Sequence, residues 1–372
     1  MRFAPDRAGM LRRCTVPVAM VMAVCLSGLG TAPAAAQGGQ ARRNPTPVRN
    51  PSPPPTDDQI TAAVNAAFAK YKGLKDGKNA DYIPALAKVD PNLFGIAVVT
   101  ADGKMYTAGN VTSEVSIQSI SKVFTMALVM NQQGPDAILK TIGADATGMR
   151  FNSIVSIEFA NKALGGPEMN ALVNPGAIAA TSMVQGKNAD DIWASISRFY
   201  SDAAGRPLKV LDDVYKSEAA SNQRNQAIGM LMYAYGYIKA NPNQATDIYT
   251  RQCSVGVNAK DLATMAATLA FGGANPVTKK QVLKASNVPM VLAVMATAGL
   301  YDDSGKWLWR TGLPAKSGVG GGLIAISPGN FGIAVISPPL DEAGNSVRAQ
   351  MAIADISNAL GGNPYAQTGQ AQ

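Results

Sequence analysis

The sequence predicts an α/β fold in which one antiparallel sheet is built from both ends of the chain. Residues 93–100 and 104–108 have strand-like patterns near the beginning, and residues 321–326 and 331–337 have them near the end. Between these segments, residues 135–309 are mostly helical in pattern. Terminal strands that bracket a helical block favour a sheet with flanking helices, a helical subdomain beside it and a cleft between the two.

The first 55 residues are not expected to join this fold. Arginines precede an apolar run over residues 16–29, and Ala34-Ala35-Ala36 completes an A-x-A cleavage pattern, so residues 1–36 predict a signal peptide. An uncleaved anchor is the alternative, although the run is shorter than the ~20 apolar residues that span a bilayer. Residues 37–55, rich in Pro, Gln and Arg, predict a disordered linker.

These two segments set the expected location and domain boundaries. A cleaved signal peptide implies an exported protein, periplasmic or secreted, with no stable membrane insertion after cleavage. The folded domain is expected over residues 56–372.

That domain is expected to begin with a helix, because Thr56-Asp57-Asp58 is a typical N-cap sequence and an apolar helical spacing starts at Ile60. The strand at residues 93–100 is followed by Asp102-Gly103, a strong signal for a tight turn that lets residues 104–108 return antiparallel. The other expected elements are a helix from Ser119 to Met130 that stops before Gly134, single helices over 222–240 and 259–272, a turn at 328–330 between the last strands, and a closing amphipathic helix over 346–360.

The chain contains no histidine, and this absence excludes several classes of active site. It rules out Ser-His-Asp and Cys-His arrangements, a histidine general base and His-ligated metals. Outside residues 1–36, Cys253 is the single cysteine, which excludes a disulfide framework and a cysteine metal cluster. We therefore expect no metal and no cofactor, and a lysine or tyrosine must move protons near neutral pH.

The net charge of +8 is unevenly distributed, since residues 1–56 carry +6 of it. The rest of the chain is nearly neutral. This distribution argues against a nucleic-acid partner for the folded domain.

Ser119 and Lys122 form a Ser-x-x-Lys motif at the start of a predicted helix. Three residues of helix place the two side chains on one face, and the free N–H groups of a helix N-terminus favour an alkoxide and an oxyanion. A desolvated lysine can lose its proton near neutral pH and serve as the base for the serine. By itself this motif is weak, because an N-cap serine followed by a solvated lysine is common.

Lys316-Ser317-Gly318 strengthens the interpretation, because it lies just before a predicted C-terminal strand. The two motifs together are the outer motifs of serine acyl-transfer enzymes. The backbone N–H of Val319 can supply a second oxyanion donor, and the glycines around it allow a substrate to approach the backbone closely.

At this level of detail the chain resembles a known family, the serine-dependent glutaminases, over residues 56–362. That family has a β-lactamase-like, DD-peptidase-like fold and hydrolyses L-glutamine to glutamate and ammonia. The resemblance rests on Gln118-Ser119-Ile120-Ser121-Lys122, Asn174 to Ile178, Ser217-Glu218 with Asn225, Tyr249 with Gln252-Cys253-Ser254, and Gly312 to Val319.

The resemblance implies a role for each matching residue. Ser119 would be the nucleophile, Lys122 its base and Tyr301 a proton relay to the leaving ammonia. The backbone N–H groups of Ser119 and Val319 would hold the oxyanion. Substrate would be bound by these groups together with Asn174, Glu218, Asn225, Tyr249 and Tyr301. The chemistry agrees, since the ammonium group of glutamine needs a carboxylate and its other polar groups need neutral donors.

Two details of this site can be examined from the sequence. Glu218 and Asn225 are seven positions apart, or two helical turns, so they are expected on one side of a helix. Pro175 stands where the family usually has alanine, and it should bias Asn174 towards an extended backbone and alter the pocket.

Three functions stay open at this point. The first is an exported glutaminase, expected to form a homo-oligomer, either a dimer or a tetramer. The second is an exported β-lactamase or penicillin-binding-type acyl transferase, which shares the outer motifs. The third is an amino-acid-binding protein without catalysis.

Overall fold

The computed structural model describes residues 54–159 and 169–366, and its central feature is a five-stranded antiparallel sheet with the order β2-β1-β7-β6-β5. Strand β1 pairs with β7, so that Gly95 lies opposite Ile336. The predicted sheet from both chain ends is therefore confirmed. The signal-peptide prediction and nearly all of the predicted linker lie outside the described residues. The strands are β1 (Gly95–Thr100), β2 (Met105–Gly109), β5 (Ala315–Ser317), β6 (Gly322–Ser327) and β7 (Phe331–Ile336).

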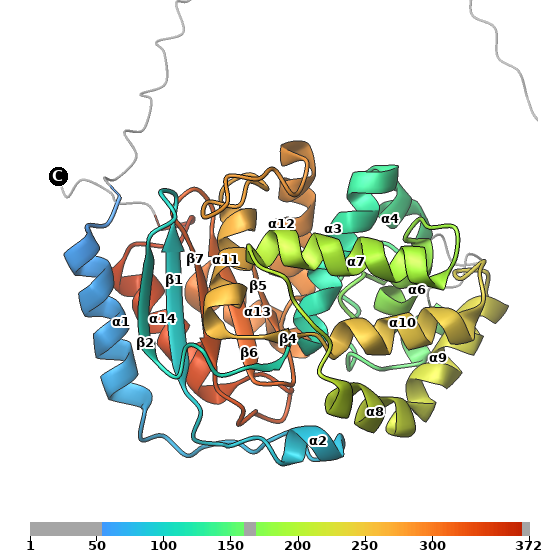
Figure 1. Ribbon diagram of the computed structural model, residues 1–372, viewed down its shortest axis with the longest axis horizontal. Coiled ribbons are helices and arrows are strands. Elements are labelled where there is room, and N and C mark those ends of the chain that lie inside the picture. Colours follow the sequence, from blue (N-terminus) through green and yellow to red (C-terminus); the bar gives the residue numbers. More distant parts are fainter. Residues whose placement is uncertain (1–53, 160–168, 367–372) are drawn as a thin grey trace, which may run out of the picture. The chain divides into compact units, whose positions relative to one another are not determined.

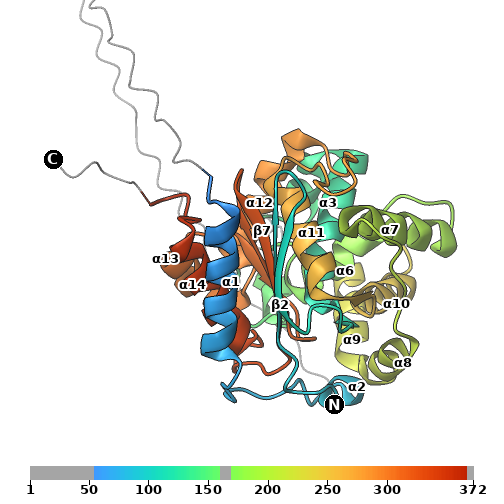
Figure 2. The same ribbon diagram turned by 60° about the vertical axis from the view of Figure 1, so that its left-hand side comes forward.

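Both faces of the sheet are covered, which explains why its central strands are apolar without alternation. On β1, Ile96 and Val98 point to one hydrophobic cluster, whereas Ala97 and Val99 point to the other. The first cluster lies under α1 (Asp57–Tyr71) and α14 (Val347–Ala359), which pack against each other; the second lies under α11 (Ala259–Ala270). Figures 1 and 2 show the sheet between these two layers.

Several predicted boundaries are confirmed. Thr56 caps α1 in a capping box with Gln59, and Ser346 caps α14. Gly103 adopts a positive φ of 86° in the turn between β1 and β2, which only glycine takes at little cost.

A helical subdomain lies on one side of the sheet, at the right of Figure 1. It is built around α3 (Ser121–Gln133), whose first ten residues are all buried. The other helices here are α4 (Pro135–Thr141), α5 (Val155–Phe159), α6 (Asn174–Met183), α7 (Ala189–Ala204), α8 (Asp212–Ser221), α9 (Gln223–Ala234) and α10 (Pro242–Cys253).

The helix predicted over residues 222–240 is shorter than expected. It is α9, which ends at Ala234 because Gly236 has a φ of 77° that breaks the helical path. Asn222 also stands outside α9, at φ −95° and ψ 21°, and separates it from α8. No helix among the described residues is long and apolar enough to cross a bilayer.

The remaining elements include the two 3₁₀ turns that carry Ser119 and Tyr301. These remaining elements are α2 (Pro84–Ala87), α12 (Val288–Ala298), α13 (Ser304–Thr311), the 3₁₀ turns η1 (Gln118–Ile120), η3 (Ala285–Asn287) and η4 (Tyr301–Asp303), and a two-stranded ribbon of β3 (Val115–Ser116) and β4 (Gly256–Val257).

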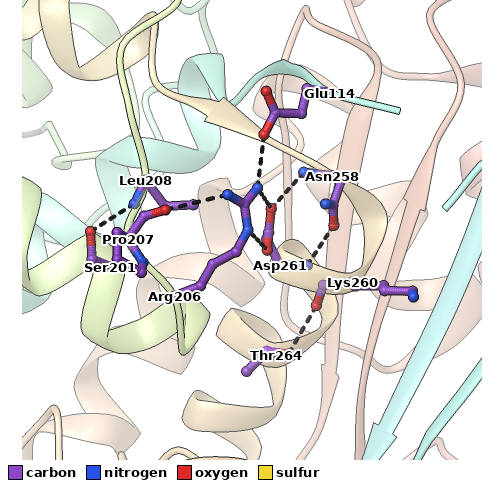
Figure 3. A network of polar contacts seen from close by, with 9 residues as sticks. All are labelled: Glu114, Ser201, Arg206, Pro207, Leu208, Asn258, Lys260, Asp261 and Thr264. Carbon is purple, nitrogen blue, oxygen red and sulfur yellow. Dashed lines mark hydrogen bonds and ion pairs between the residues drawn. The ribbon is translucent and has the colours of Figure 1, made fainter. Parts of the chain in front are cut away.

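A polar network holds this ribbon, which leads directly into η1 (Figure 3). The guanidinium of Arg206 donates to both oxygens of the Asp261 carboxylate, at 2.7 and 2.6 Å, and to Glu114 at 2.9 Å. Asp261 also closes a capping box with Asn258 at the start of α11. Because Glu114 precedes β3 and Asn258 follows β4, one arginine joins the end of α7 to both strands of the ribbon.

Candidate active site

Ser119 lies in the middle of η1, immediately before α3, and its residue is 7% exposed. The preceding residue, Gln118, has a φ of 48°, which is strained for a non-glycine residue. The Gln118 amide holds this conformation by donating to Ser116 Oγ at 3.2 Å and to Glu218 Oε2 at 3.1 Å. The candidate nucleophile is thus presented on a strained turn rather than within the helix proper.

Lys122 follows in the first turn of α3 and is 1% exposed. Its Nζ donates to Asn174 Oδ1 at 2.6 Å, and among the described residues it makes no hydrogen bond to Ser119. Burial lowers the pKa of Lys122 to about 8, against the opposing pull of Cys253 and Glu218. At pH 7 roughly a tenth of the amine is then neutral, and this is the form that a base requires.

Asn174 is the hub of the polar contacts. Its Oδ1 accepts from Lys122 and from the Tyr249 hydroxyl at 3.2 Å, and its Nδ2 donates to Asn225 Oδ1 at 2.9 Å. It is the first residue of α6, and the preceding residue, Val173, is the extended one. The expected bias of Asn174 towards an extended backbone is therefore wrong: Pro175 occupies the first helical turn, where a missing N–H leaves no intrahelical bond unmade.

Glu218 and Asn225 do not share a helix as predicted. Glu218 lies on α8 and Asn225 on α9, and the interruption at Asn222 turns both towards the same cavity. Burial raises the pKa of Glu218 to about 7, while the Gln118 hydrogen bond and the charge of Lys122 oppose the rise. A ligand ammonium group would favour its ionised form.

Tyr301 begins η4 with a φ of 57°, a second strained residue at the site. Two positions earlier, position 299 requires glycine, because a Cβ there would lie 1.7 Å from the carbonyl oxygen of Ala315. The Tyr301 hydroxyl is buried without a hydrogen-bond partner in the described structure. Burial raises its pKa, against the opposing influence of the nearby Ser119 and Ser317 hydroxyls.

Lys316 and Ser317 form the end of edge strand β5, and Gly318 follows it; the motif also lies before β6, as the sequence predicts. A Cβ on Gly318 would lie 2.7 Å from the carbonyl oxygen of Ile117, so the end of β5 touches the backbone beside Ser119. Within the described residues, neither the N–H of Ser119 nor that of Val319 donates to another protein group. Two free N–H groups on adjoining segments are what an oxyanion needs.

A cavity of about 160 Å³ joins these residues. Six of the predicted residues line it, and the other two lie just outside. Lys122 is hydrogen-bonded to Asn174, and the ring of Tyr301 packs against that of Phe151 in the cavity wall, with 4.9 Å between the centroids. The lining residues are Tyr82, Ile83, Gln118, Ser119, Phe151, Asn152, Asn174, Glu218, Ser221, Asn222, Arg224, Asn225, Tyr249 and Val319.

Some participants were not assigned a role from the sequence. Tyr82, Phe151 and Gln118 line the cavity, and Lys316 lies with its Nζ 3.9 Å from the ring centroid of Tyr301. A role for Gln118 could have been predicted, because it directly precedes Ser119 in the sequence. Tyr82 and Phe151 lie in irregular segments, where periodicity carries no information.

The arrangement is suited to acyl transfer. It contains a hydroxyl on a strained turn, an amine with a lowered pKa, two free backbone N–H groups and a buried phenol, all around a small polar cavity. In the described part of the chain, no cluster of Cys, Asp and Glu side chains is suited to hold a metal ion.

Comparison with known proteins gives a consistent result. A family model described as "Glutaminase" matches residues 77–365. A protein named glutaminase from Colwellia psychrerythraea is 52% identical over 311 residues, which are 84% of this chain and 99% of the relative.

Solved structures agree in fold. One titled a probable glutaminase has a TM-score of 0.82 at 45% identity, covering 84% of this chain and 100% of the other. Another, titled as Mglu in its glutamate form, has a TM-score of 0.75 at 35% identity, covering 81% of this chain and 68% of the other. The α/β, β-lactamase-like fold expected from the sequence is confirmed. This chain belongs to the glutaminase family.

Proposed function

We propose that this protein hydrolyses the side-chain amide of L-glutamine to give L-glutamate and ammonia through an acyl-enzyme on Ser119. The observation that carries the proposal is a single cavity lined by Ser119, by Val319 and by the Glu218 carboxylate, with two free backbone N–H groups beside the serine. Such a cavity can hold an ammonium group at Glu218 and present a side-chain amide to the serine. The glutamate-bound relative supports an amino-acid ligand.

The first half of the proposed reaction forms the acyl-enzyme. Neutral Lys122 takes the proton of Ser119 Oγ, which attacks the amide carbon, and the oxyanion is held by the N–H groups of Ser119 and Val319. Tyr301 gives its proton to the nitrogen as the C–N bond breaks, and Lys122 returns a proton to Tyr301. Ammonia leaves.

The second half uses water. A water molecule attacks the acyl carbon and gives one proton to the pair formed by Lys122 and Tyr301. The same pair returns a proton to Ser119 Oγ as the bond between this oxygen and the acyl carbon breaks. Asn174 orients Lys122 through its 2.6 Å contact, and Asn225 and Tyr249 orient Asn174 in turn.

The test is ammonia release from glutamine and from asparagine by the purified protein. Ser119→Ala should lower kcat for glutamine by at least about 10³-fold, because the nucleophile is lost. Ser182→Ala, on the outer part of α6, is the matched control and should keep full activity. Normal turnover by the Ser119 variant would refute the acyl-enzyme. Hydrolysis of a chromogenic β-lactam without ammonia release would favour the alternative acyl transferase, and stoichiometric glutamine binding without turnover would favour the binding protein.

We also propose that the protein is exported, with residues 1–36 removed, and that it works as a homo-oligomer without stable membrane insertion. The leader composition supports export. Half-exposed apolar side chains on α9, Met230 and Tyr233, support self-association. Mass spectrometry of the exported chain tests the cleavage, and a mature N-terminus at Gln37 is expected. Light scattering tests the homo-oligomer, and a monomeric mass would contradict it.

A further inference from the structure

Two buried hydroxyls beside the nucleophile have no hydrogen-bond partner in the described structure, Tyr301 Oη and Ser317 Oγ. Ser317 is fully buried and Tyr301 is 7% exposed. Buried hydroxyls are normally satisfied, because leaving one unpaired forfeits its interaction with water. Two such groups at one place point to a contact that is completed during the reaction.

The surroundings explain why neither hydroxyl finds a partner elsewhere. Lys316 Nζ donates to the main-chain oxygen of Ser317 at 2.7 Å, so the amine does not engage the Ser317 hydroxyl. The same Nζ lies 3.9 Å from the ring centroid of Tyr301, and Lys122 Nζ lies 5.6 Å from it. Both amines face the ring, which leaves the phenol oxygen to the Ser119 and Ser317 hydroxyls.

The Ser317 hydroxyl lies close enough to the Tyr301 oxygen to affect its pKa. Burial raises the pKa of Tyr301, and the hydroxyls of Ser119 and Ser317 oppose that rise, as donors to a phenolate do. Ser119 becomes acylated during the reaction and can no longer donate. Ser317 is then the remaining hydroxyl for this oxygen.

We propose that Ser317 is a positioning residue that acts through Tyr301, donating a hydrogen bond to Tyr301 Oη as that oxygen gives its proton to the leaving ammonia. The inference rests on the proposed function of Tyr301. The proton balance is unchanged: Tyr301 loses one proton to nitrogen and regains one from Lys122, while the Ser317 proton stays on its own oxygen and only turns towards the developing phenolate.

This role predicts a dependence on the leaving group. An amine must be protonated before it leaves, whereas an ester can expel its alkoxide from the tetrahedral intermediate without prior protonation. Glutamate γ-methyl ester is only one heavy atom larger than glutamine and yields the same acyl-enzyme. Loss of the Ser317 hydroxyl should therefore affect glutamine far more than the ester.

The experiment compares kcat/KM for glutamine and for the γ-methyl ester, since this parameter ends at release of the first product. Ser317→Ala should lower the value for glutamine roughly 10- to 100-fold, the usual effect of losing a hydrogen bond to a developing charge, and the value for the ester less than about threefold. Ser317→Thr, which keeps the hydroxyl, should restore most of the activity on glutamine.

A double-mutant cycle tests whether the effect passes through Tyr301. Tyr301→Phe should show the same preference for the ester, and adding Ser317→Ala to it should cost less than about threefold more. Ser327→Ala is the matched control: this serine is also fully buried, lies at the far end of β6 and donates to the Gly362 oxygen at 2.7 Å. It should change thermal stability without changing the amide-to-ester ratio.

Three results would overturn the inference. These are equal losses on both substrates, an unchanged rate on glutamine, or a full additional loss in the double variant. If the wild-type protein releases no ammonia from glutamine, the proposed function itself fails, and that result is distinct from the other three. Circular dichroism of each variant confirms folding, and Ser317→Cys, which replaces the hydroxyl with a weakly donating thiol, keeps the test available if Ser317→Ala is poorly folded.

Discussion

At the scale of single residues, the site depends on two buried charges whose pKa values have moved towards each other. Burial brings the pKa of Lys122 down to about 8 and that of Glu218 up to about 7. Each also stabilises the charged form of the other, so the two titrate as a coupled pair. The proposed chemistry needs neutral Lys122 and ionised Glu218, and each of these two groups reaches the required form by losing one proton.

The pH profile follows from this direction. kcat/KM for glutamine should rise as the pH increases from about 6 to about 8.5 and then level. A plot of log(kcat/KM) against pH should have a slope between one and two over the rise, because Glu218 and Lys122 must each lose a proton. Glu218→Gln should raise KM and reduce the slope to one, leaving a single ionisation from Lys122. The measurement is a set of initial rates across this range.

Glu158→Gln, which alters an exposed carboxylate on α5, is the control and should leave the profile unchanged. A profile that falls as the pH rises through 7 would contradict the assignment of the two groups.

The residues themselves could be predicted, but most of their contacts could not. Spacing placed Ser119 and Lys122 on one helical face, whereas the role of Glu218 towards the ammonium group came from the family resemblance, with which the chemistry agrees. The hydrogen bond between Lys122 and Asn174 joins two helices that are far apart in sequence, and no local pattern encodes it. The positive φ of Tyr301 is likewise imposed by packing, since tyrosine has no preference for that conformation.

At the scale of elements, long periodic segments were predicted well and short or interrupted ones were not. Helices α1, α11 and α14 and strands β1, β6 and β7 lie close to their expected positions. The helix expected over 222–240 begins as predicted, with Asn222 as its N-cap, but it ends early because Gly236 turns the chain. Strand β5 has three residues, too few for a period.

The contact between α12 and β5 gives a prediction at this scale. Gly299→Ala places a methyl group against the Ala315 carbonyl oxygen and should lower the free energy of unfolding by about 2–3 kcal/mol. It should also lower kcat, because Tyr301 is two residues away and must shift. Thermal unfolding and ammonia release measure the two effects.

The matched control is Gly305→Ala on α13, where nothing lies within 4 Å of the new Cβ. This change should leave activity intact and leave the stability equal or raise it by up to about 1 kcal/mol. Indistinguishable behaviour of the two variants would disprove the role given to close backbone contact at Gly299.

At the scale of the whole molecule, the sheet and the helical subdomain are joined by the Arg206 network shown in Figure 3. The Asp261 side chain is 5% exposed and receives two Arg206 bonds as well as the N–H of Asn258. Asp261→Ala should lower the free energy of unfolding by about 2–3 kcal/mol, since it leaves a half-buried guanidinium and a helix cap without an acceptor. Urea denaturation measures this.

Asp81→Ala is the comparison for an exposed pair. Asp81 binds Lys78 at 3.3 Å with both side chains more than two-thirds exposed, and its removal should not change the midpoint of unfolding measurably. Equal effects of the two aspartate changes would show that the network contributes no more than a surface ion pair.

The order of the strands has a consequence for how the enzyme is made. Gly95 pairs with Ile336, so β1 leaves the ribosome long before its partner exists, and β6 and β7 complete the sheet only near the end of translation. The proposed oxyanion donor Val319 belongs to that last segment, whereas Ser119 and Lys122 are synthesised early. A partial chain therefore holds the proposed nucleophile and its base without Tyr301 or the second oxyanion donor, and the site is completed only when synthesis is almost finished.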